Sequence, residues 1–492
     1  MLNYLKQEAN YTVTENGAVT HKSTLNRVLD VFALGGAVRN RVNDDLYYKM
    51  IVPALEQNTV LAMKTIFHLA DIREGQGERA FFKLVLKNMA KEYPDVLAKV
   101  LPLVPHYTRW DYLYELDGTK LENLAYSIIR QEVMPLINEP TKTSLVFKWL
   151  KSVNTSSAVS TRLGKKTAMA LGLSIPRYRK LLSAKRKLLG DAVVETKLSA
   201  KAYDDINYSQ VPSRAGFRYK NAFRKNDGKR YETFLEKAET GEVKINTANL
   251  YPHDLVYKAR TGDKDKALDV MWKNLPNYAK TSENVLPLVD VSGSMFTQVN
   301  DKTDVRAIDV SIGLGMYLAE HNTGKFANHF LTFSSQPALV EIVGQTLFQK
   351  FHSMERSNWT MSTNLEAAFK LILDTAIKYN LPQSEMPSKI VIFSDMEFDR
   401  CVTNPTDTNY INLQKKFASN GYEIPQVVFW NVCARNSQVP VTFNQRGTAL
   451  VSGFSPITLK FVLAGEITTP EDLMLSVINT ERYQPVEDVL VA

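Results

Sequence analysis

The segment LPLVDVSGSM at residues 286–295 limits the possible folds of this chain more than any other feature of its sequence. Its apolar first half is typical of a buried strand, and Asp290, Ser292 and Ser294 follow at alternate positions as that strand ends. Successive side chains of a strand point to opposite faces, so residues two apart point the same way. Three side-chain oxygens are therefore directed to one point above a sheet edge, which suits a hard cation such as Mg2+.

The C-terminal part of the chain alternates strands with helices. Apolar runs bounded by polar turns predict strands near residues 285–290, 327–333, 338–343, 389–394, 426–432 and 448–452. Periodic segments predict helices near residues 304–321, 364–379, 408–420 and 469–480. This alternation favours a mostly parallel, doubly wound, Rossmann-like sheet with right-handed crossovers, which brings the polar residues to one edge.

Two further oxygen ligands are expected from other loops of this region. Thr363 lies in the polar segment SNWTMSTNLEAAF, and Asp395 ends the strand KIVIFSD at the edge where ligands of open α/β sheets bind. We therefore expect a site for Mg2+, Mn2+ or Ca2+ with the Asp290 carboxylate at an exposed sheet edge. The alternative is that the D-x-S-x-S run forms a turn whose side chains only cap a helix.

The set Asp290, Ser292, Ser294, Thr363 and Asp395 resembles the metal-ion-dependent adhesion site of von Willebrand factor A domains. The resemblance covers residues 282–492 and implies an A domain there. It also implies a metal ion with an open coordination position, which takes an Asp or Glu side chain from a protein partner in adhesion receptors and in chelatase or AAA+ accessory subunits.

The N-terminal region, residues 1–281, is predicted to be helix after helix. Apolar residues recur at spacings of three and four from TLNRVLDVFALGGAVRN to SLVFKWLKSV, and short polar breaks separate the periodic segments. Paired helices in series without strands favour an α-solenoid of HEAT type. An irregular helical bundle is the alternative.

Positive charge is concentrated between these two regions. Residues 161–230 hold 18 Lys and Arg against 5 Asp and Glu, a local excess of +13, whereas the whole chain carries only +8. Basic groups bind phosphates, and exposed aromatic rings stack on unpaired bases, so the segment indicates an RNA partner. The candidate RNA-binding residues are Arg177, Arg179, Lys180, Lys185, Arg186, Lys187, Arg214, Arg218, Lys220, Arg224, Lys225, Lys229 and Arg230.

A solvated charged surface is the alternative for these cations. The aromatic residues among them, Phe217, Tyr219, Phe223 and Tyr231, are more readily explained as core faces of helices than as stacking platforms.

The two regions together resemble the Ro RNA-binding autoantigen family, in which a ring of helical repeats, the TROVE module, is closed by a von Willebrand A domain. The segments LADIREGQGERAFFKLVL, PHYTRWDYLYELDGT, FKWLKSVNTSS and KINTANLYPHDLVYKA also look like an uncharacterised family of Ro-like proteins of bacteria and their viruses. The resemblance implies a non-catalytic ribonucleoprotein component. Small structured non-coding or misfolded RNA would lie on the outer basic face, and single-stranded ends would enter the ring.

Other classes of function compete with this interpretation. A protein-binding module, in which the metal receives a partner's carboxylate without any RNA, explains the metal residues equally well but leaves the basic segment unexplained. A two-metal nuclease would use Glu397 and Asp399 with the two aspartates, but such a site needs several bridging carboxylates where this chain has Ser and Thr. We therefore expect no enzymatic activity.

Composition limits the environment of the chain. With 44% hydrophobic and 23% charged residues it is typical of a globular protein, and no stretch is apolar enough to span a membrane. The first residues lack the pattern of a signal peptide and only two cysteines occur, so we expect a cytoplasmic protein without membrane contact. Of the two, Cys433 in an apolar strand is expected to be a buried free thiol.

Overall fold

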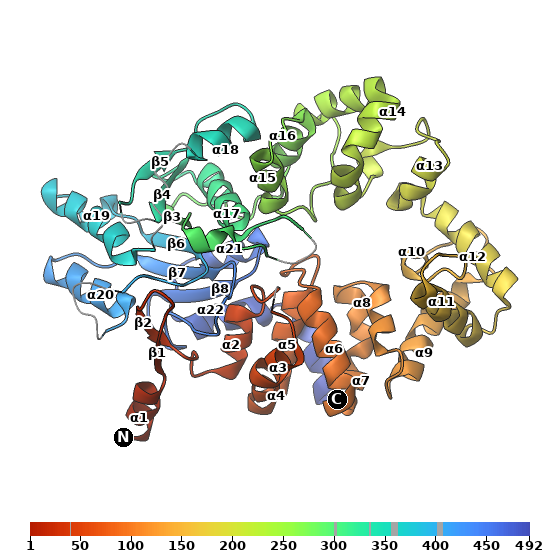
Figure 1. Ribbon diagram of the computed structural model, residues 1–492, viewed down its shortest axis with the longest axis horizontal. Coiled ribbons are helices and arrows are strands. Elements are labelled where there is room, and N and C mark those ends of the chain that lie inside the picture. Colours follow the sequence, from red (N-terminus) through yellow and green to blue (C-terminus); the bar gives the residue numbers. More distant parts are fainter. Residues whose placement is uncertain (40, 300–302, 334–335, 356–362, 401–406) are drawn as a thin grey trace.

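A six-stranded mixed sheet forms the centre of the C-terminal region (Figure 1). The computed structural model describes residues 1–39, 41–299, 303–333, 336–355, 363–400 and 407–492. The strands are β3 (Val285–Asp290), β4 (His329–Phe333), β5 (Leu339–Glu341), β6 (Lys389–Ser394), β7 (Gln426–Asn431) and β8 (Thr448–Ser452). Their spatial order is β5-β4-β3-β6-β7-β8, and every neighbouring pair is parallel except β4 and β5.

This strand order is that of a doubly wound sheet, in which the chain first builds outward from β3 and then returns to start again at β6. The register places Leu288 between Leu331 and Ile392. Central strands of such a sheet are covered on both faces, which is why β3 and β6 are wholly buried and apolar except at their ends. The predicted α + α/β fold class is confirmed.

Helices cover both faces of the sheet. The side chains of β3 point alternately into two hydrophobic cores, one on each face of the sheet. Leu286 packs with the helices of residues 365–378 and 409–419, whereas Val289 packs with the helix of residues 307–321. The helices of this region are α17 (Ala307–His321), α18 (Leu347–Glu355), α19 (Leu365–Lys378), α20 (Asn409–Ser419), α21 (Leu459–Val462), α22 (Pro470–Ile478) and α23 (Gln484–Val491). Of these, α18, α21 and α23 were not predicted.

The rest of the chain is helical apart from one short hairpin. The helices are α1 (Leu2–Ala9), α2 (Arg27–Leu34), α3 (Asp44–Leu46), α4 (Val52–Gln57), α5 (Thr59–Ala70), α6 (Ala80–Glu92), α7 (Pro94–Val100), α8 (Val104–Tyr107), α9 (Glu122–Val133), α10 (Val146–Trp149), α11 (Ala158–Ala170), α12 (Ile175–Leu188), α13 (Glu195–Ser199), α14 (Ser213–Glu239), α15 (Pro252–Arg260) and α16 (Lys266–Lys273). From α6 to α16 they follow a curved path, here called the helical arc, that leaves the sheet region and returns to it (Figure 1).

The two ends of the helical arc meet at the loop between α5 and α6. The Tyr251 hydroxyl, at the start of α15, donates a hydrogen bond to the Gln76 carbonyl oxygen at 3.3 Å. The Gln76 side chain in turn donates to Thr458 Oγ1 at 2.9 Å and accepts from the Ser455 amide at 3.0 Å. One glutamine therefore joins both ends of the arc to the segment that follows β8.

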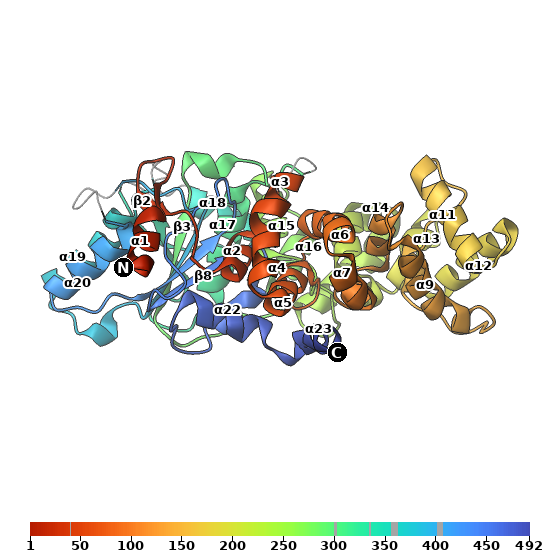
Figure 2. The ribbon, with the colours of Figure 1, turned by 90° about the horizontal axis from the view of Figure 1, so that it is seen from below.

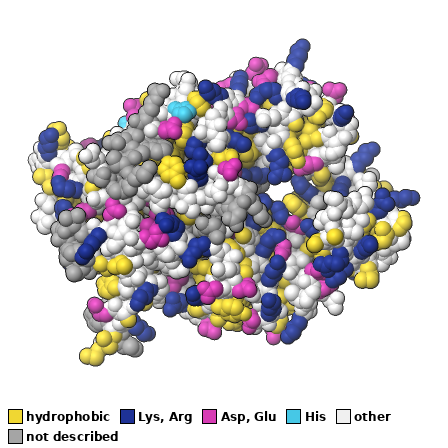
Figure 3. Space-filling model, viewed as in Figure 1, with side chains coloured by type: hydrophobic (Ala, Val, Ile, Leu, Met, Phe, Trp, Pro, Cys, Tyr) yellow, Lys and Arg dark blue, Asp and Glu magenta, His cyan; other side chains and the backbone are white. Residues whose placement is uncertain are grey.

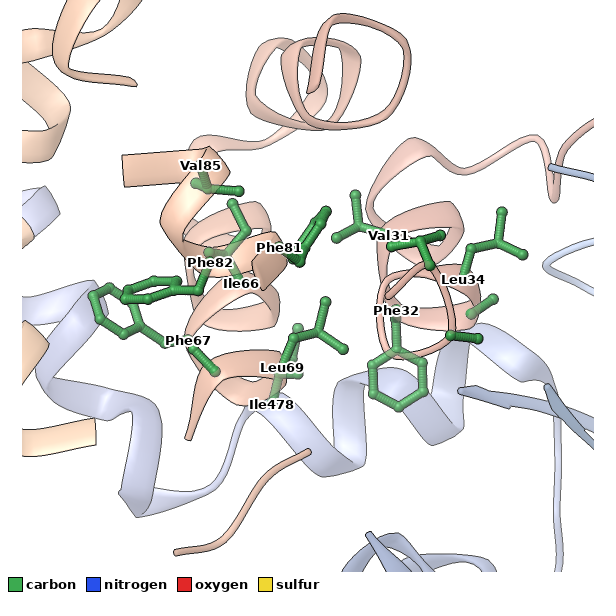
Figure 4. Packing of buried hydrophobic residues seen from close by; sticks show 14 of the residues in the cluster. Val31, Phe32, Leu34, Ile66, Phe67, Leu69, Phe81, Phe82, Val85 and Ile478 are labelled. Atoms are coloured by element: carbon green, nitrogen blue, oxygen red, sulfur yellow. The ribbon is translucent and has the colours of Figure 1, made fainter. Parts of the chain in front are cut away.

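Packing against the sheet begins early in the chain. Helix α2 lies against the edge strand β8, where a Cβ at Gly36 would come within 2.6 Å of the Ser452 carbonyl oxygen. Only glycine permits that close approach. Figure 4 shows the core that results, with Phe32 of α2 near Leu69 of α5 and Ile478 of α22.

Each end of the chain packs against the region that contains the other end. The hairpin formed by β1 (Tyr11–Val13) and β2 (Val19–His21) pairs with Val439 of the C-terminal region through main-chain hydrogen bonds at His21. Helix α23 returns to pack on α5 and α7, on the side seen in Figure 2. The predicted domain boundary between residues 281 and 282 stays a prediction, because both hydrophobic cores contain residues from either side of it.

A buried ion pair fixes the C-terminal end to the helical region. Arg482 makes two hydrogen bonds to the fully buried Asp71 carboxylate, at 2.8 and 3.0 Å. The Tyr483 hydroxyl donates to the same carboxylate at 3.3 Å and lies 3.1 Å from His68 Nδ1. Among the described helices, none is long and apolar enough to cross a membrane.

Replacing Asp71 should destabilise the whole protein. In Asp71→Ala the Arg482 guanidinium keeps its charge in a mostly buried place without its carboxylate partner, so we expect the free energy of unfolding to fall by about 3 kcal/mol. Denaturant unfolding followed by tryptophan fluorescence measures this change. Glu481→Ala, at an exposed neighbouring position, is the control and should change it by less than about 0.5 kcal/mol. Equal effects of the two variants would show that the Asp71–Arg482 ion pair does not stabilise the protein.

Candidate functional site

The end of β3 brings the first three predicted metal residues together. The Asp290 carboxylate accepts a hydrogen bond from the Ser292 amide at 2.9 Å, and the Ser292 and Ser294 hydroxyl oxygens lie 3.1 Å apart. Ser311 of α17 fixes the main chain here, since its hydroxyl accepts from the Asp290 amide at 3.1 Å and donates to the Phe393 carbonyl at 2.8 Å. The D-x-S-x-S run thus leaves the strand as a rigid turn.

Asp395 reaches the same place from the end of β6. It is 2% exposed, and its Oδ1 accepts from the Glu397 amide at 3.2 Å, whereas its buried Oδ2 has no hydrogen-bond donor among the described residues and lies 3.8 Å from Arg435 Nη1. Burial raises the pKa of Asp395, while the Ser294 hydroxyl acts in the opposite direction. An unsatisfied buried carboxylate oxygen is costly in a native protein. This oxygen is therefore where a cation would be expected.

Asp290 is fully buried, so the expectation that its carboxylate stands at an exposed edge is wrong. The turn after β3 and the Ser394 hydroxyl, which donates to Asp290 Oδ2, enclose the carboxylate. Burial, and then the charge of Asp395, raise the pKa of Asp290 above its usual range. Two carboxylates that oppose one another's ionisation in a water-poor place have the electrostatics of a cation site.

Thr363 lies at the same end of the sheet but has other partners. Its hydroxyl lies 2.7 Å from the Glu397 carbonyl oxygen and 3.0 Å from Asp399 Oδ1, and it is 1% exposed. These contacts hold Thr363 against the loop that follows Asp395. No hydrogen bond joins it to the other four predicted ligands among the described residues.

The donor set fits a small hard cation. Carboxylate and hydroxyl oxygens are the ligands that Mg2+ and Mn2+ accept, and two carboxylates with two serine hydroxyls leave room for water or another ligand. Within the described ranges no three His, Cys, Asp or Glu side chains gather as a metal cluster, so the fit depends on the serines as well as on Asp290 and Asp395. We call this end of the sheet the metal edge.

Sequence reasoning missed the residues that cover the metal edge. Residues 14–18, the hairpin tip between β1 and β2, lie against the loop that follows Asp395. Glu397 is buried there and accepts hydrogen bonds from the Glu15 amide, Asn436 and Gln438, each at 2.8 Å. No periodicity or motif near residue 15 indicated this contact, because it joins residues about 380 positions apart.

Six of the predicted RNA-binding cations are used inside the protein. Lys220 is buried between Asp263 and Asp265, at 2.8 and 2.9 Å, and Lys185 is buried against main-chain carbonyls. The remaining four make ion pairs or carbonyl contacts: Arg186, Arg214, Arg224 and Arg230. These six side chains stabilise the helical arc, which a charge count alone does not reveal.

The other seven predicted cations are exposed, and within the described part of the chain they form no ion pair or hydrogen bond. They are Arg177, Arg179, Lys180, Lys187, Arg218, Lys225 and Lys229. Residues three and seven apart share one face of a helix, so Arg177, Lys180 and Lys187 form a stripe along α12. Figure 3 shows Lys and Arg side chains gathered on this side of the molecule, over the helical arc.

The aromatic residues of the basic segment divide in a similar way. Phe223 and Tyr231 are 0% and 2% exposed and pack with Tyr208, so they belong to the core. Phe217 and Tyr219 are half-buried against the same core. The explanation as core faces therefore holds for Phe223 and Tyr231.

A further cation escaped the sequence analysis. Arg79, just before α6, is exposed and has no ion-pair partner among the described residues. Partial desolvation and the charges of Arg109 and Arg214 lower its pKa, which indicates that three guanidinium groups from distant segments lie near one another. The only local signal was the run REGQGER, whose glycines form the turn between α5 and α6.

Removing the charge of Asp290 should abolish metal binding without loss of the fold. In Asp290→Asn the amide keeps the shape of the side chain and removes the repulsion from Asp395, so circular dichroism should be unchanged. We expect Mn2+ affinity, measured by calorimetry, to fall at least about 100-fold, or about 2.7 kcal/mol. Asp374→Asn, on the exposed side of α19, is the control. Undiminished affinity in Asp290→Asn would remove Asp290 from the site.

Comparison with known proteins relates both regions to families of unknown function. A model of the domain of unknown function DUF7788 matches residues 284–488, and a model of the domain of unknown function DUF2828 matches residues 141–287. An uncharacterised protein, L728, of Acanthamoeba polyphaga mimivirus is 28% identical over 523 residues, which cover 97% of this chain and 89% of the viral protein. The two family matches meet at the start of β3, and the similarity to the viral protein includes both regions.

Proposed function

We propose that this chain is a non-catalytic, cytoplasmic RNA-binding protein of Ro type, with a divalent-metal A domain for contact with a partner or ligand. The observation that supports RNA binding most directly is the set of seven exposed cations on the helical arc that have no side-chain partner among the residues the structure describes. A folded protein gains nothing from leaving so many like charges together, whereas a polyanion neutralises them and releases its counterions.

The shape of the helical arc supports the same proposal. Its ends meet through Tyr251 and Gln76, so the arc and the sheet region surround a space, and Lys and Arg side chains border it in Figure 3. Arg79, which is exposed and has no ion-pair partner among the described residues, extends the basic surface toward the place where the ends meet. A single strand of RNA has one charge per nucleotide, so a row of guanidinium groups suits its backbone.

A second candidate function is a metal-dependent contact with another protein, without RNA. It is favoured by the buried, unsatisfied Oδ2 of Asp395, which supports a cation at the metal edge. A cation held by two carboxylates and two hydroxyls accepts a further carboxylate readily. The two functions are compatible, since the metal edge and the helical arc are different surfaces.

Neutralising the α12 stripe should weaken RNA binding in a salt-dependent manner. For Arg177→Ala, Lys180→Ala and Lys187→Ala together, we expect the slope of log affinity against log salt to fall by about three and affinity to fall at least about tenfold at low salt. Filter binding or fluorescence anisotropy with a single-stranded homopolymer and with a hairpin RNA measures both. The two RNAs should lose affinity by a similar factor because phosphate contacts do not read sequence.

The matched control removes three exposed cations outside the helical arc: Lys280→Ala, Lys378→Ala and Arg446→Ala. This control should bind RNA nearly as the parent does. Equal losses of RNA affinity in the two triple variants would mean that the α12 stripe contributes no more than any other exposed cations. No RNA binding by the parent would favour the protein-contact function instead.

Metal and RNA should be nearly independent ligands. A cation with one open position cannot neutralise the many phosphates of an RNA strand, so its removal should matter little to RNA affinity. We expect EDTA to change that affinity by less than about threefold, or about 0.7 kcal/mol. Anisotropy titrations with and without chelator measure this ratio. A hundredfold loss with an intact circular dichroism spectrum would mean that the cation itself holds RNA.

A further inference from the structure

The hairpin tip covers the metal edge through side-chain contacts. Asn16 Nδ2 donates to Thr363 Oγ1 at 3.0 Å and to the Glu397 carbonyl oxygen at 2.7 Å. Thr14 Oγ1 donates to the Phe398 carbonyl at 2.7 Å. Thr363 and Glu397 flank the metal edge, so the tip lies over the entrance by which another molecule would approach it.

Glu15 is the carboxylate of this tip, and one guanidinium group separates it from the proposed metal ligands. Glu15 Oε2 lies 2.6 Å from Arg435 Nη2, and Arg435 Nη1 lies 3.8 Å from the unsatisfied Asp395 Oδ2. Asn436 Nδ2 links Glu15, at 3.1 Å, to Glu397, at 2.8 Å. The chain therefore brings an acidic side chain of its own to the place where a partner's carboxylate would enter.

The contacts at the base of the hairpin differ from those at its tip. At the base, His21 and Val439 exchange two main-chain hydrogen bonds of 3.0 and 2.9 Å, and Thr20 Oγ1 donates to the Val439 carbonyl at 2.8 Å. The tip is held by the side chains of Thr14 and Asn16, by the Glu15 amide and by an isolated bridge between Gly17 and Asp399, and the Glu15 side chain remains 43% exposed. None of these contacts involves His21 or Val439, so their loss leaves the base paired.

We propose that the hairpin tip is an internal cap of the metal edge, in which Glu15 and Asn16 cover the entrance that a partner's acidic side chain would use. A carboxylate-bearing protein partner then binds only by displacing the tip, and Arg435 passes from Glu15 to the incoming carboxylate. The inference rests on the metal site of the proposed function and adds a regulatory step to it. Each ligand shifts the open fraction only by its preference for the open state.

Bound Mn2+ reports directly on the cap, because water molecules that exchange on the ion accelerate proton relaxation. In the parent the tip should restrict this exchange, and in Glu15→Gln/Asn16→Ala the relaxation enhancement per bound Mn2+ should rise by about twofold as positions open to water. Acetate, the probe for a partner's carboxylate, should lower the enhancement in the double variant and leave the parent unchanged. Glu8→Gln, an exposed glutamate of α1, is the control for loss of charge and should behave as the parent.

The outcomes separate the cap from the metal site. Equal enhancement in the parent, the double variant and the control would overturn the cap while leaving the metal site intact. Mn2+ binding that is lost only in the double variant would make Glu15 and Asn16 parts of the site and would also overturn the cap. Absence of Mn2+ binding in every protein would remove the metal site of the proposed function, and the cap with it.

A disulfide that locks the tip tests the same inference in the opposite direction. A Cβ built at Gly17 lies 3.8 Å from Arg400 Cβ, which is the separation that a disulfide requires, and because a cysteine is strained at the Gly17 φ of +84°, the reduced protein is the control for that strain. Gly17→Cys/Arg400→Cys, added to the Glu15→Gln/Asn16→Ala variant together with Cys401→Ser to avoid a competing thiol, should show low enhancement and no response to acetate when oxidised. Reduction should restore the higher enhancement and the acetate response of the double variant in the same sample. If the oxidised lock exchanges water as freely as the double variant, the cap is excluded.

Discussion

Two acidic side chains that are buried at the ends of neighbouring parallel strands impose the main constraint on this structure. Asp290 is the last residue of β3 and Asp395 directly follows β6, and these are the two strands between which the chain reverses its direction of winding. Ligands of doubly wound sheets bind at this switch point because the loops diverge there. Burial and mutual repulsion disfavour two ionised carboxylates, so the surrounding hydroxyls, the Arg435 guanidinium and a cation each have an electrostatic reason to be present.

The helical arc depends on a different use of charge. Its basic segment supplies both the ion pairs that hold α14 to α16 and the free cations that remain for a ligand. Lys220 illustrates the first use, because the carboxylates of Asp263 and Asp265 offset the cost of burying its ammonium group. Arg177 on α12 illustrates the second. A local excess of positive charge in a sequence is therefore the sum of a structural part and a binding part.

The sheet was predictable because each strand is marked by a pattern within its own short stretch of sequence. Central strands are buried on both faces, so runs such as IVIF are apolar without interruption, and the polar residues that follow them mark the metal edge. The hairpin was not predictable, since its three-residue strands carry no apolar pattern and Thr14 meets Phe398, 384 residues away. The burial of Asp290 escaped prediction for a related reason: the surrounding turn and the Ser394 hydroxyl come together only in the tertiary fold.

The crossing of the two chain ends has a consequence for biosynthesis. The first β-hairpin emerges from the ribosome long before Val439, with which it pairs. Helix α5 and Asp71 are likewise synthesised long before their partners α23 and Arg482. The early helices can form from local contacts as they are made, but both cores stay incomplete until translation is nearly finished. A chain that stalls or is cleaved before residue 482 therefore leaves Asp71 buried without its arginine, and such products are natural targets for proteolytic quality control.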